Sequence, residues 1–200
     1  MIKLRLFLAG LLLWGLAACS SSGTSTPHYY AIALPDTQSH MVAPALQPVV
    51  AVNDIELADY LNSVGIVYQQ DDVQLVTANQ HRWAEALDKQ LTRSLLQNLR
   101  QQLPAYQWQT GQIARQTVAQ LQVKVRGFHG RADGHAVISG EWTLLTATQQ
   151  YSGQFQQHYP LTTDGYPALV RELRAGWQQT SQQLAVQLKP LLATAAHHAE

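Results

Sequence analysis

Apolar and polar residues alternate along three stretches in the second half of the chain. In the first stretch, Leu121, Val123 and Val125 are separated by polar side chains, and residues 136–144 and 151–161 repeat the pattern. A period of two residues is typical of a strand that buries one of its faces. Because short connections join the stretches, we predict three successive antiparallel strands.

A period of four residues indicates a first helix. Trp83 begins a series of leucines that recur every fourth residue as far as Leu103. This spacing places the apolar side chains on one face of a helix. Asn79 is a candidate N-cap and Pro104 a stop signal, so the pattern predicts a helix from about residue 82 to residue 103.

The strongest helical pattern lies near the C-terminus. Between Tyr166 and Leu188, the positions of one face are spaced by three or four residues throughout. Asp164 is a candidate cap. Pro190 predicts the end of the helix, because proline lacks the backbone N–H that the helix would need there. Residues 193–200 are predicted to form a frayed tail.

Shorter strands are predicted before the first helix. Tyr29–Leu34 and Val49–Leu57 are rich in aromatic or aliphatic residues. Ile66–Gln70 and Val73–Thr77 read as a hairpin, joined by the turn-forming pair Asp71–Asp72. Strands and helices in this order predict an α+β fold. We expect a two-layer sandwich in which two long helices pack on one face of a mainly antiparallel sheet.

The N-terminus carries a targeting segment. Lys3 and Arg5 precede an apolar run, Leu6–Leu16, that is about half as long as the roughly 20 residues that cross a bilayer. A basic start, a short apolar centre and small residues before a cleavage site are features of a secretory signal peptide. Residues 1–18 are therefore predicted to be removed.

The four residues Leu16–Cys19 resemble the lipobox of bacterial lipoproteins. This resemblance implies cleavage between Ala18 and Cys19, a thioether from the Cys19 sulfur to diacylglycerol, and a palmitate-type acyl group on its new amino group. Three acyl chains would hold the protein on a membrane permanently, since one alone binds reversibly. Ser20, in place of the Asp that resembles an inner-membrane retention signal, implies the outer membrane. The alternative is an ordinary signal peptide with an unmodified cysteine.

Residues 19–28 are predicted to be a lipidated N-terminus with a short flexible tether. Eight extended residues span at most about 28 Å, so the folded part is expected close to its membrane. The rest of the chain is long enough for one domain with a core, which we place at residues 29–192.

The amino-acid composition limits the kinds of molecule that the protein is expected to bind. The chain has 13 basic and 13 acidic residues, and losing Lys3 and Arg5 leaves a net charge of about −2. This balance argues against nucleic acid and against adhesion to anionic lipid. Charged residues make up only 13% of the chain, and 26 glutamines stand in their place, which favours a surface that assembles with other proteins. Cys19 is the only cysteine, so no internal disulfide is expected.

Candidate catalytic and metal-binding residues do not form a recognisable motif. His129 and His135 flank a predicted turn but lack a patterned third ligand, and His197–His198 lies in the predicted tail. Asp71–Asp72 could be paired carboxylates, although a solvated turn explains them more simply. Ser139 lies outside any Gly-x-Ser-x-Gly elbow. We therefore expect no enzymatic activity, no metal and no cofactor.

Several runs along the chain are similar to one known family. They are Tyr29–Leu34, Gly65–Tyr68, Asp71–Val73, Asn79–Asp88, Phe128–Gly134 and Ser139–Trp142. Together they resemble the PqiC (YmbA) family of ABC-type transport auxiliary lipoproteins over nearly the whole mature chain. Ala86 departs from the family pattern, in which proline often precedes the leucine, so the helix start is expected to shift by a residue or two from that of relatives.

The resemblance implies a role rather than a reaction. Such lipoproteins sit on the periplasmic face of the outer membrane and serve a lipid-transport machine. Their partner is a PqiB-like MCE-domain protein that spans the periplasm, and a homo-oligomeric ring of the lipoprotein would receive its far end. Partner contacts do not transfer residue by residue. Phe128, His129 and Arg131 are our candidates, because an aromatic residue beside an arginine is a common interface anchor. The alternative is that Phe128 closes the core.

Two other function classes stay open at this stage. A pilot or assembly lipoprotein for an outer-membrane β-barrel would share the anchor and the fold. A tethered periplasmic hydrolase would need a polar cleft with convergent titratable groups.

Overall fold

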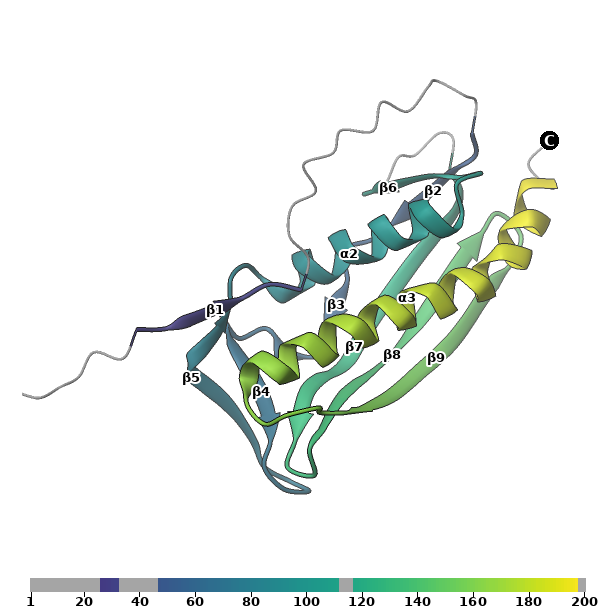
Figure 1. Ribbon diagram of the computed structural model, residues 1–200. Coiled ribbons are helices and arrows are strands. Elements are labelled where there is room, and N and C mark those ends of the chain that lie inside the picture. The colour runs from purple at the N-terminus through teal and green to yellow at the C-terminus, as the bar shows by residue number, and fades with distance from the viewer. Residues whose placement is uncertain (1–25, 33–46, 112–116, 198–200) are drawn as a thin grey trace, which may run out of the picture.

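The computed structural model describes residues 26–32, 47–111 and 117–197, which form one nine-stranded sheet and two long helices (Figure 1). The strands are β1 (His28–Tyr30), β2 (Val49–Val52), β3 (Glu56–Leu57), β4 (Gly65–Gln69), β5 (Leu75–Trp83), β6 (Gln107–Thr110), β7 (Thr117–Arg131), β8 (His135–Thr146) and β9 (Gln150–Pro160). The helices are α2 (Leu87–Gln102) and α3 (Tyr166–His197), with one 3-10 turn, η2 (Asp59–Leu61).

Strand β7 is the centre of the sheet. Along one edge it pairs antiparallel with β8, which pairs antiparallel with β9, so the predicted meander is confirmed. Along its other edge it pairs in turn with β2, β3 and β4, all parallel. These parallel pairs were not predicted, because the strands that form them lie far apart in the sequence.

Helices α2 and α3 lie side by side on one face of the sheet (Figure 1). Beneath them, alternate residues of β7 such as Ala119, Leu121 and Val123 are buried. The helices and the sheet form two layers around one core, as predicted for an α+β sandwich. The predicted fold class is therefore confirmed.

Three aromatic side chains occupy the centre of this core. The ring of Phe128 on β7 lies 6.3 Å from the ring of Trp177 on α3 and 6.0 Å from the ring of Trp83 on β5. None of the three is more than 5% exposed. The indole N–H of Trp177 also donates to the backbone carbonyl of Leu91 at 3.2 Å, so this side chain joins both helices as well as the sheet.

The first helix begins later than the leucine series predicts. Residues up to Trp83 belong to β5, and α2 begins only at Leu87. Asn79 is therefore a strand residue and not an N-cap. The backbone N–H of Trp83 donates to Val64, and that of Ala84 donates to Tyr30. These bonds to neighbouring segments of the sheet outweigh the local helical pattern.

The last helix continues through Pro190 to His197, so the predicted stop at the proline and the frayed tail from residue 193 are wrong over this part. A proline within a helix leaves the carbonyl four residues earlier, here that of Val186, without its usual donor. Val186 and Pro190 both lie on the exposed side, where water can satisfy this carbonyl. On the other side, Leu192 is buried and extends the core beyond the proline.

The remaining predicted strands are present with altered bounds. Val49–Leu57 is divided into β2 and β3, and the described part of the first predicted strand is β1. The β4–β5 hairpin is confirmed, with the carboxylate of Asp71 accepting bonds from the backbone N–H groups of Val73 and Gln74. Strand β6, parallel to β2, was not predicted. None of the helices described is long and apolar enough to cross a membrane.

Two buried polar side chains of α2 hold extended segments against the helix. Gln90 is 1% exposed. Its Oε1 accepts from the backbone N–H of Ile32 at 2.7 Å, and its Nε2 donates to the carbonyl of Glu85 at 2.8 Å. Similarly, the hydroxyl oxygen of Thr92 accepts from the N–H of Ile55 at 3.0 Å. Because Ile32 comes shortly after β1, Gln90 fixes the N-terminal segment to the domain.

Gly140 occupies a position on β8 with no room for a side chain. A Cβ there would lie 2.2 Å from the carbonyl oxygen of Lys124 and 2.5 Å from Cζ of Phe155. We expect Gly140→Ala to lower the free energy of unfolding by about 1–3 kcal/mol, the usual cost of overpacking, as measured by urea denaturation. Ser152→Ala, on the exposed side of β9, is the matched control and should change it by less than about 0.5 kcal/mol. A Gly140→Ala variant as stable as the parent would contradict this packing.

Gln90→Leu tests the attachment of the N-terminal segment. The substitution removes the acceptor of a buried N–H, so we expect it to destabilise the domain by about 1–3 kcal/mol. Amide hydrogen exchange at Ile32 should also become faster. Gln101→Leu, on an exposed position near the end of α2, should leave exchange at Ile32 unchanged. Equal protection of this amide in both variants would show that Gln90 does not hold the segment.

Candidate functional site

The predicted lipidation site, Cys19, lies outside the described residues, as does the predicted signal peptide. The described chain begins at residue 26, and β1 forms an edge of the sheet, where it pairs parallel with β5. The N-terminal segment therefore joins the domain at this edge.

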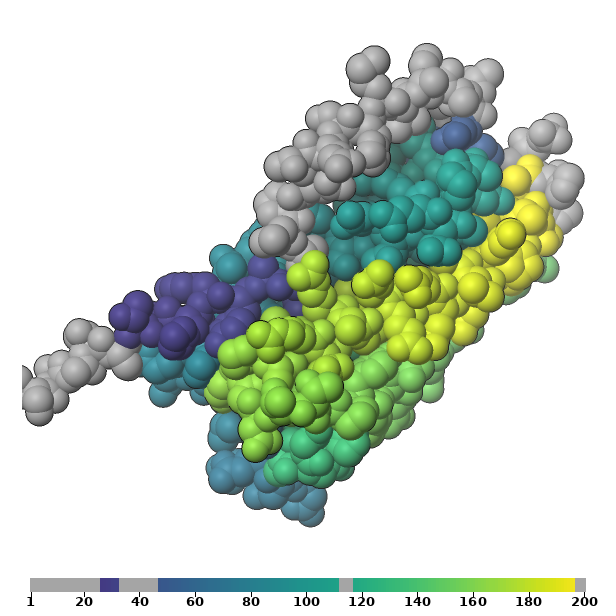
Figure 2. Space-filling view, viewed as in Figure 1, coloured from purple at the N-terminus to yellow at the C-terminus, as the bar shows by residue number. Residues whose placement is uncertain are grey.

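Stacked rings fix β1 to the rest of the domain. The His28 ring lies 5.2 Å from the ring of His81, which in turn lies 4.0 Å from the ring of Tyr166 at the start of α3. The hydroxyl of Tyr30 is hydrogen-bonded to Nδ1 of His81 at 2.9 Å. Burial, and then the neighbouring His28, lower the pKa of His81, so the ring is neutral near pH 7. Figure 2 shows β1, in purple, beside the first turns of α3.

The three predicted partner residues do not share a face of β7. Phe128 is 1% exposed and belongs to the aromatic core, so the prediction that it anchors a partner is wrong. His129 points to the opposite face of the sheet, where its ring lies 6.1 Å from that of Tyr60 and is 8% exposed. Arg131 lies at the end of the strand and is ion-paired with Asp133 at 2.8 Å. Of the three, only Arg131 offers a partner substantial surface.

His129 is an enclosed, neutral ring. Burial, and then the charges of Arg131 and His158, lower its pKa. Its Nδ1 has no hydrogen-bond partner among the residues that the structure describes. With only 8% of its surface exposed, the His129 side chain offers a partner little area for contact.

The face of β7–β9 turned away from the helices is polar, and we call it the open face. Its polar side chains include Gln120, Gln122, Lys124, Arg126, Ser139, Glu141, Thr143, Ser152, Gln154, Gln156 and His158. Lys124 is paired with Glu56 at 3.1 Å, and Arg126 with Glu141 at 2.8 Å. The open face is therefore rich in amides and nearly uncharged, which favours specific hydrogen bonds with a partner over attraction by net charge.

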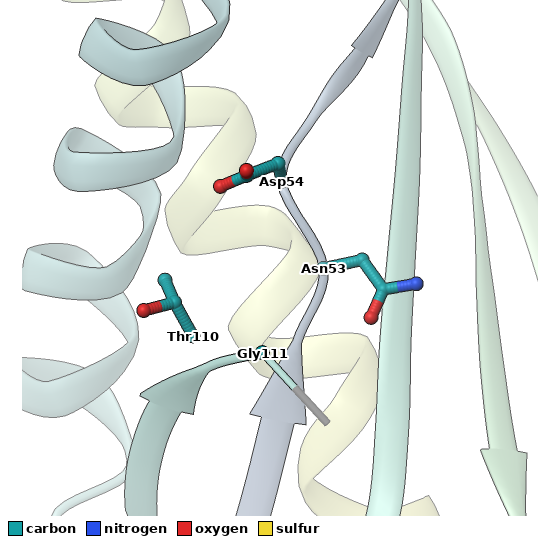
Figure 3. Close-up of a pocket in the computed structure, with 4 residues that line it drawn as sticks. All are labelled: Asn53, Asp54, Thr110 and Gly111. Atoms are coloured by element: carbon teal, nitrogen blue, oxygen red, sulfur yellow. The ribbon is translucent and has the colours of Figure 1, made fainter. Parts of the chain in front are cut away.

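A polar hollow of about 390 Å³ lies where β2 and β6 end, and Figure 3 shows the residues that line it. They are Asn53, Asp54, Thr110 and Gly111. Asp54 is ion-paired with Lys89, and the amide oxygen of Asn53 accepts a bond from Nε2 of Gln120 at 2.8 Å. The Asp54 carboxylate and the Asn53 amide oxygen of this hollow are thus both paired within the domain.

The other titratable candidates do not converge. The Asp71 carboxylate holds a turn, and Nδ1 of His135 lies 3.2 Å from the carboxylate of Asp133 rather than near His129. Within residues 26–32, 47–111 and 117–197, no group of three His, Cys, Asp or Glu side chains is placed to hold a metal ion. A second hollow, of about 300 Å³ at the start of α3, is lined mainly by apolar residues such as Leu161 and Leu169.

Comparison with known proteins identifies relatives along almost the whole chain. The family model for the ABC-type transport auxiliary lipoprotein component matches residues 30–185. The intermembrane transport lipoprotein PqiC of Escherichia coli is 35% identical over 183 residues, which is 90% of this chain and 94% of that protein. PqiC of Shigella flexneri matches with the same identity and coverage.

Solved structures agree with this assignment. A crystal structure of an uncharacterized protein, 36% identical, superposes with a TM-score of 0.71 and covers 82% of this chain and 99% of its own. A crystal structure of a Xanthomonas campestris protein, 18% identical, shares the fold with a TM-score of 0.68, over 86% of this chain and 98% of its own. The chain therefore belongs to the family of ABC-type transport auxiliary lipoproteins, in the group that includes PqiC.

Proposed function

We propose that this protein is a periplasmic lipoprotein anchored in the outer membrane, where it serves as a non-catalytic auxiliary component of an MCE-type intermembrane lipid transport system. In this role it docks the periplasm-spanning MCE-domain protein at the outer membrane. The observation that carries the proposal is the 35% identity, over 90% of the chain, with a protein named an intermembrane transport lipoprotein.

The anchor is the Leu16–Cys19 lipobox, with cleavage before Cys19 and lipidation of its sulfur and amino group. Each buried methylene contributes about 0.8 kcal/mol, so three acyl chains make the attachment permanent. The first described strand, β1, begins at His28, which supports a short tether between the domain and that membrane.

Docking and self-assembly are supported by the surface of the meander. Strand β9 pairs only with β8 among the described strands, which leaves its second edge unpaired. The exposed positions along most of β9 are uncharged, including Gln150, Ser152, Gln154 and Gln156. An unpaired edge without charged side chains is able to pair with another chain. Together with the open face, whose charged side chains are ion-paired, this supports a homo-oligomeric ring around the docking site.

Substitution of Cys19 tests the anchor. Cys19→Ala removes the only thiol that can take the diacylglycerol, so we expect the protein to leave the outer-membrane fraction while its folded domain keeps the free energy of unfolding of the parent domain. Ser20→Ala is the control and should stay in the outer membrane. Mass spectrometry of the parent protein should find an acylated Cys19 at the mature N-terminus, and an unmodified thiol there would refute the anchor.

Identification of the bound partner tests the role. We expect the lipidated protein, purified from envelopes after crosslinking, to carry an MCE-domain protein as its main partner. A photo-crosslinking residue at Arg131 should give this adduct more strongly than one at Gln179 on the exposed side of α3. An outer-membrane β-barrel as the main partner would instead favour a pilot role and contradict the proposal.

A further inference from the structure

Strand β1 is attached to the sheet by few backbone contacts. It has three residues, and among the described strands it pairs only with β5. A short edge segment with few hydrogen bonds opens locally at a low cost in free energy. The attachment of β1 therefore depends strongly on the side chains that it places against its neighbours.

Two side chains of β1 contact the same histidine ring. His28 is the direct partner of His81 in the parallel register, and the two rings lie 5.2 Å apart, centre to centre, with an angle of 13° between their planes. The hydroxyl of Tyr30 is hydrogen-bonded to Nδ1 of His81 at 2.9 Å. A change in the charge of His81 therefore acts on both of these contacts.

The neighbouring tyrosines do not titrate in the range in which histidine does. The ring of Tyr166, at the start of α3, stacks on His81 at 4.0 Å. Burial, and then the neighbouring Tyr68 and Tyr30, raise the pKa of Tyr166, and burial raises the pKa of Tyr30. Both rings thus stay uncharged from pH 5 to pH 8, and only the two histidines change their charge.

The charged residues near the histidine pair do not offer it a counter-charge. Glu85 is ion-paired with an arginine of α2, and Asp164 lines the hollow at the start of α3. Arg82, the next residue of β5, is itself a cation. Burial, and then the charge of His28, lower the pKa of His81, and no carboxylate contributes to this shift.

Acid is therefore expected to weaken the attachment of β1. Because the pKa of His81 is lower in the attached strand than its ordinary value of 6.5, the attached state binds fewer protons than the released state. The attachment is strongest above pH 6.5 and weakens as the pH falls below this value. In water, two unit charges separated by 5.2 Å repel each other enough to shift an equilibrium about fourfold.

We propose that His28 and His81 form an acid-sensitive clasp, which holds β1 on the sheet at neutral pH and releases it when both rings carry a charge. Release ends at Ile32, because Oε1 of the buried Gln90 still accepts its backbone N–H. Residues 28–31 then join the tether and lengthen it by up to about 14 Å. This added reach rests on the lipid anchor of the proposed function, whereas the clasp itself does not.

A spin label on β1 of the full lipidated protein tests the clasp. The thioether would occupy the Cys19 sulfur, so Tyr29→Cys provides one reactive thiol at an exposed position. We expect the ratio of mobile to immobile nitroxide to be about fourfold higher at pH 5 than at pH 7.5. The same label on Val186→Cys, at an exposed position of α3, should not respond to pH. An unchanged ratio at residue 29 would overturn the proposal, as would an equal change at residue 186, which would indicate unfolding of the whole domain.

His28→Phe isolates the contribution of charge. Phenylalanine keeps an aromatic ring against His81 but takes up no proton, so the rise in mobile label at pH 5 should become much smaller. His158→Gln removes an exposed histidine of the open face and is the matched control, which should keep the fourfold rise. An undiminished rise in His28→Phe would overturn the clasp. So would an undiminished rise in the parent protein at 1 M NaCl, where the screening length is only about 3 Å.

Flotation tests the anchor separately from the clasp. The labelled protein is mixed with vesicles of phosphatidylethanolamine and phosphatidylglycerol and is centrifuged through a density gradient. Protein that responds to pH at residue 29 but does not float would support the clasp and refute the anchor. Protein that floats without this response would refute the clasp and leave the proposed function intact.

Discussion

Strand β7 must satisfy backbone hydrogen bonds along both of its edges while it buries one of its faces under α3. One edge is served by β8 over nearly its whole length, and the other is divided among β2, β3 and β4. A bulge between Val125 and Gly127 shifts the alternation, so that Phe128 rather than its neighbours enters the core. Helix α3 packs against β7, and β2, β3, β4 and β8 pair with it directly. Helix α2 and the strands β1, β5, β6 and β9 are held through these elements.

Local patterns predicted the parts of this fold that local interactions determine. The meander and the body of α3 produce periods of two and of 3.6 residues, which a short window of sequence contains. The parallel pairs of β1 with β5 and of β2 with β6 join strands separated by helices and loops, and no short pattern indicates them. Trp83 shows the difficulty clearly. It lies in register with the leucines of α2, yet its buried side chain is the last of a strand, because both elements pack into the same core.

The difference between local patterns and long-range contacts also explains which candidate functional residues the sequence could indicate. Cys19 is proposed as the lipidation site on a contiguous motif, which needs no knowledge of the fold. Phe128 is a candidate contact residue because it lies near Arg131 at a turn, with a place in the core as the alternative, and the ring of Trp177 beside it shows that it faces inward. The stack of His28, His81 and Tyr166 brings together residues from three distant segments, so no sequence signal announced it.

The proposed lipid anchor can hold the whole domain at a membrane only if the first strand is firmly attached to the rest of the domain. Strand β1 has three residues, so its own backbone hydrogen bonds are too few to keep it attached to the sheet under a pulling force. Its backbone accepts a bond from Ala84 at the carbonyl of Tyr30, and Gln90 holds Ile32 shortly after it. The ring of His81 then joins this strand to α3. A pull from the proposed anchor along the axis of β1 would load its bonds to β5 together in shear instead of opening them one at a time. The stacked rings and the buried amide at this edge thus connect a short strand to both helices, as the proposed N-terminal anchor would require.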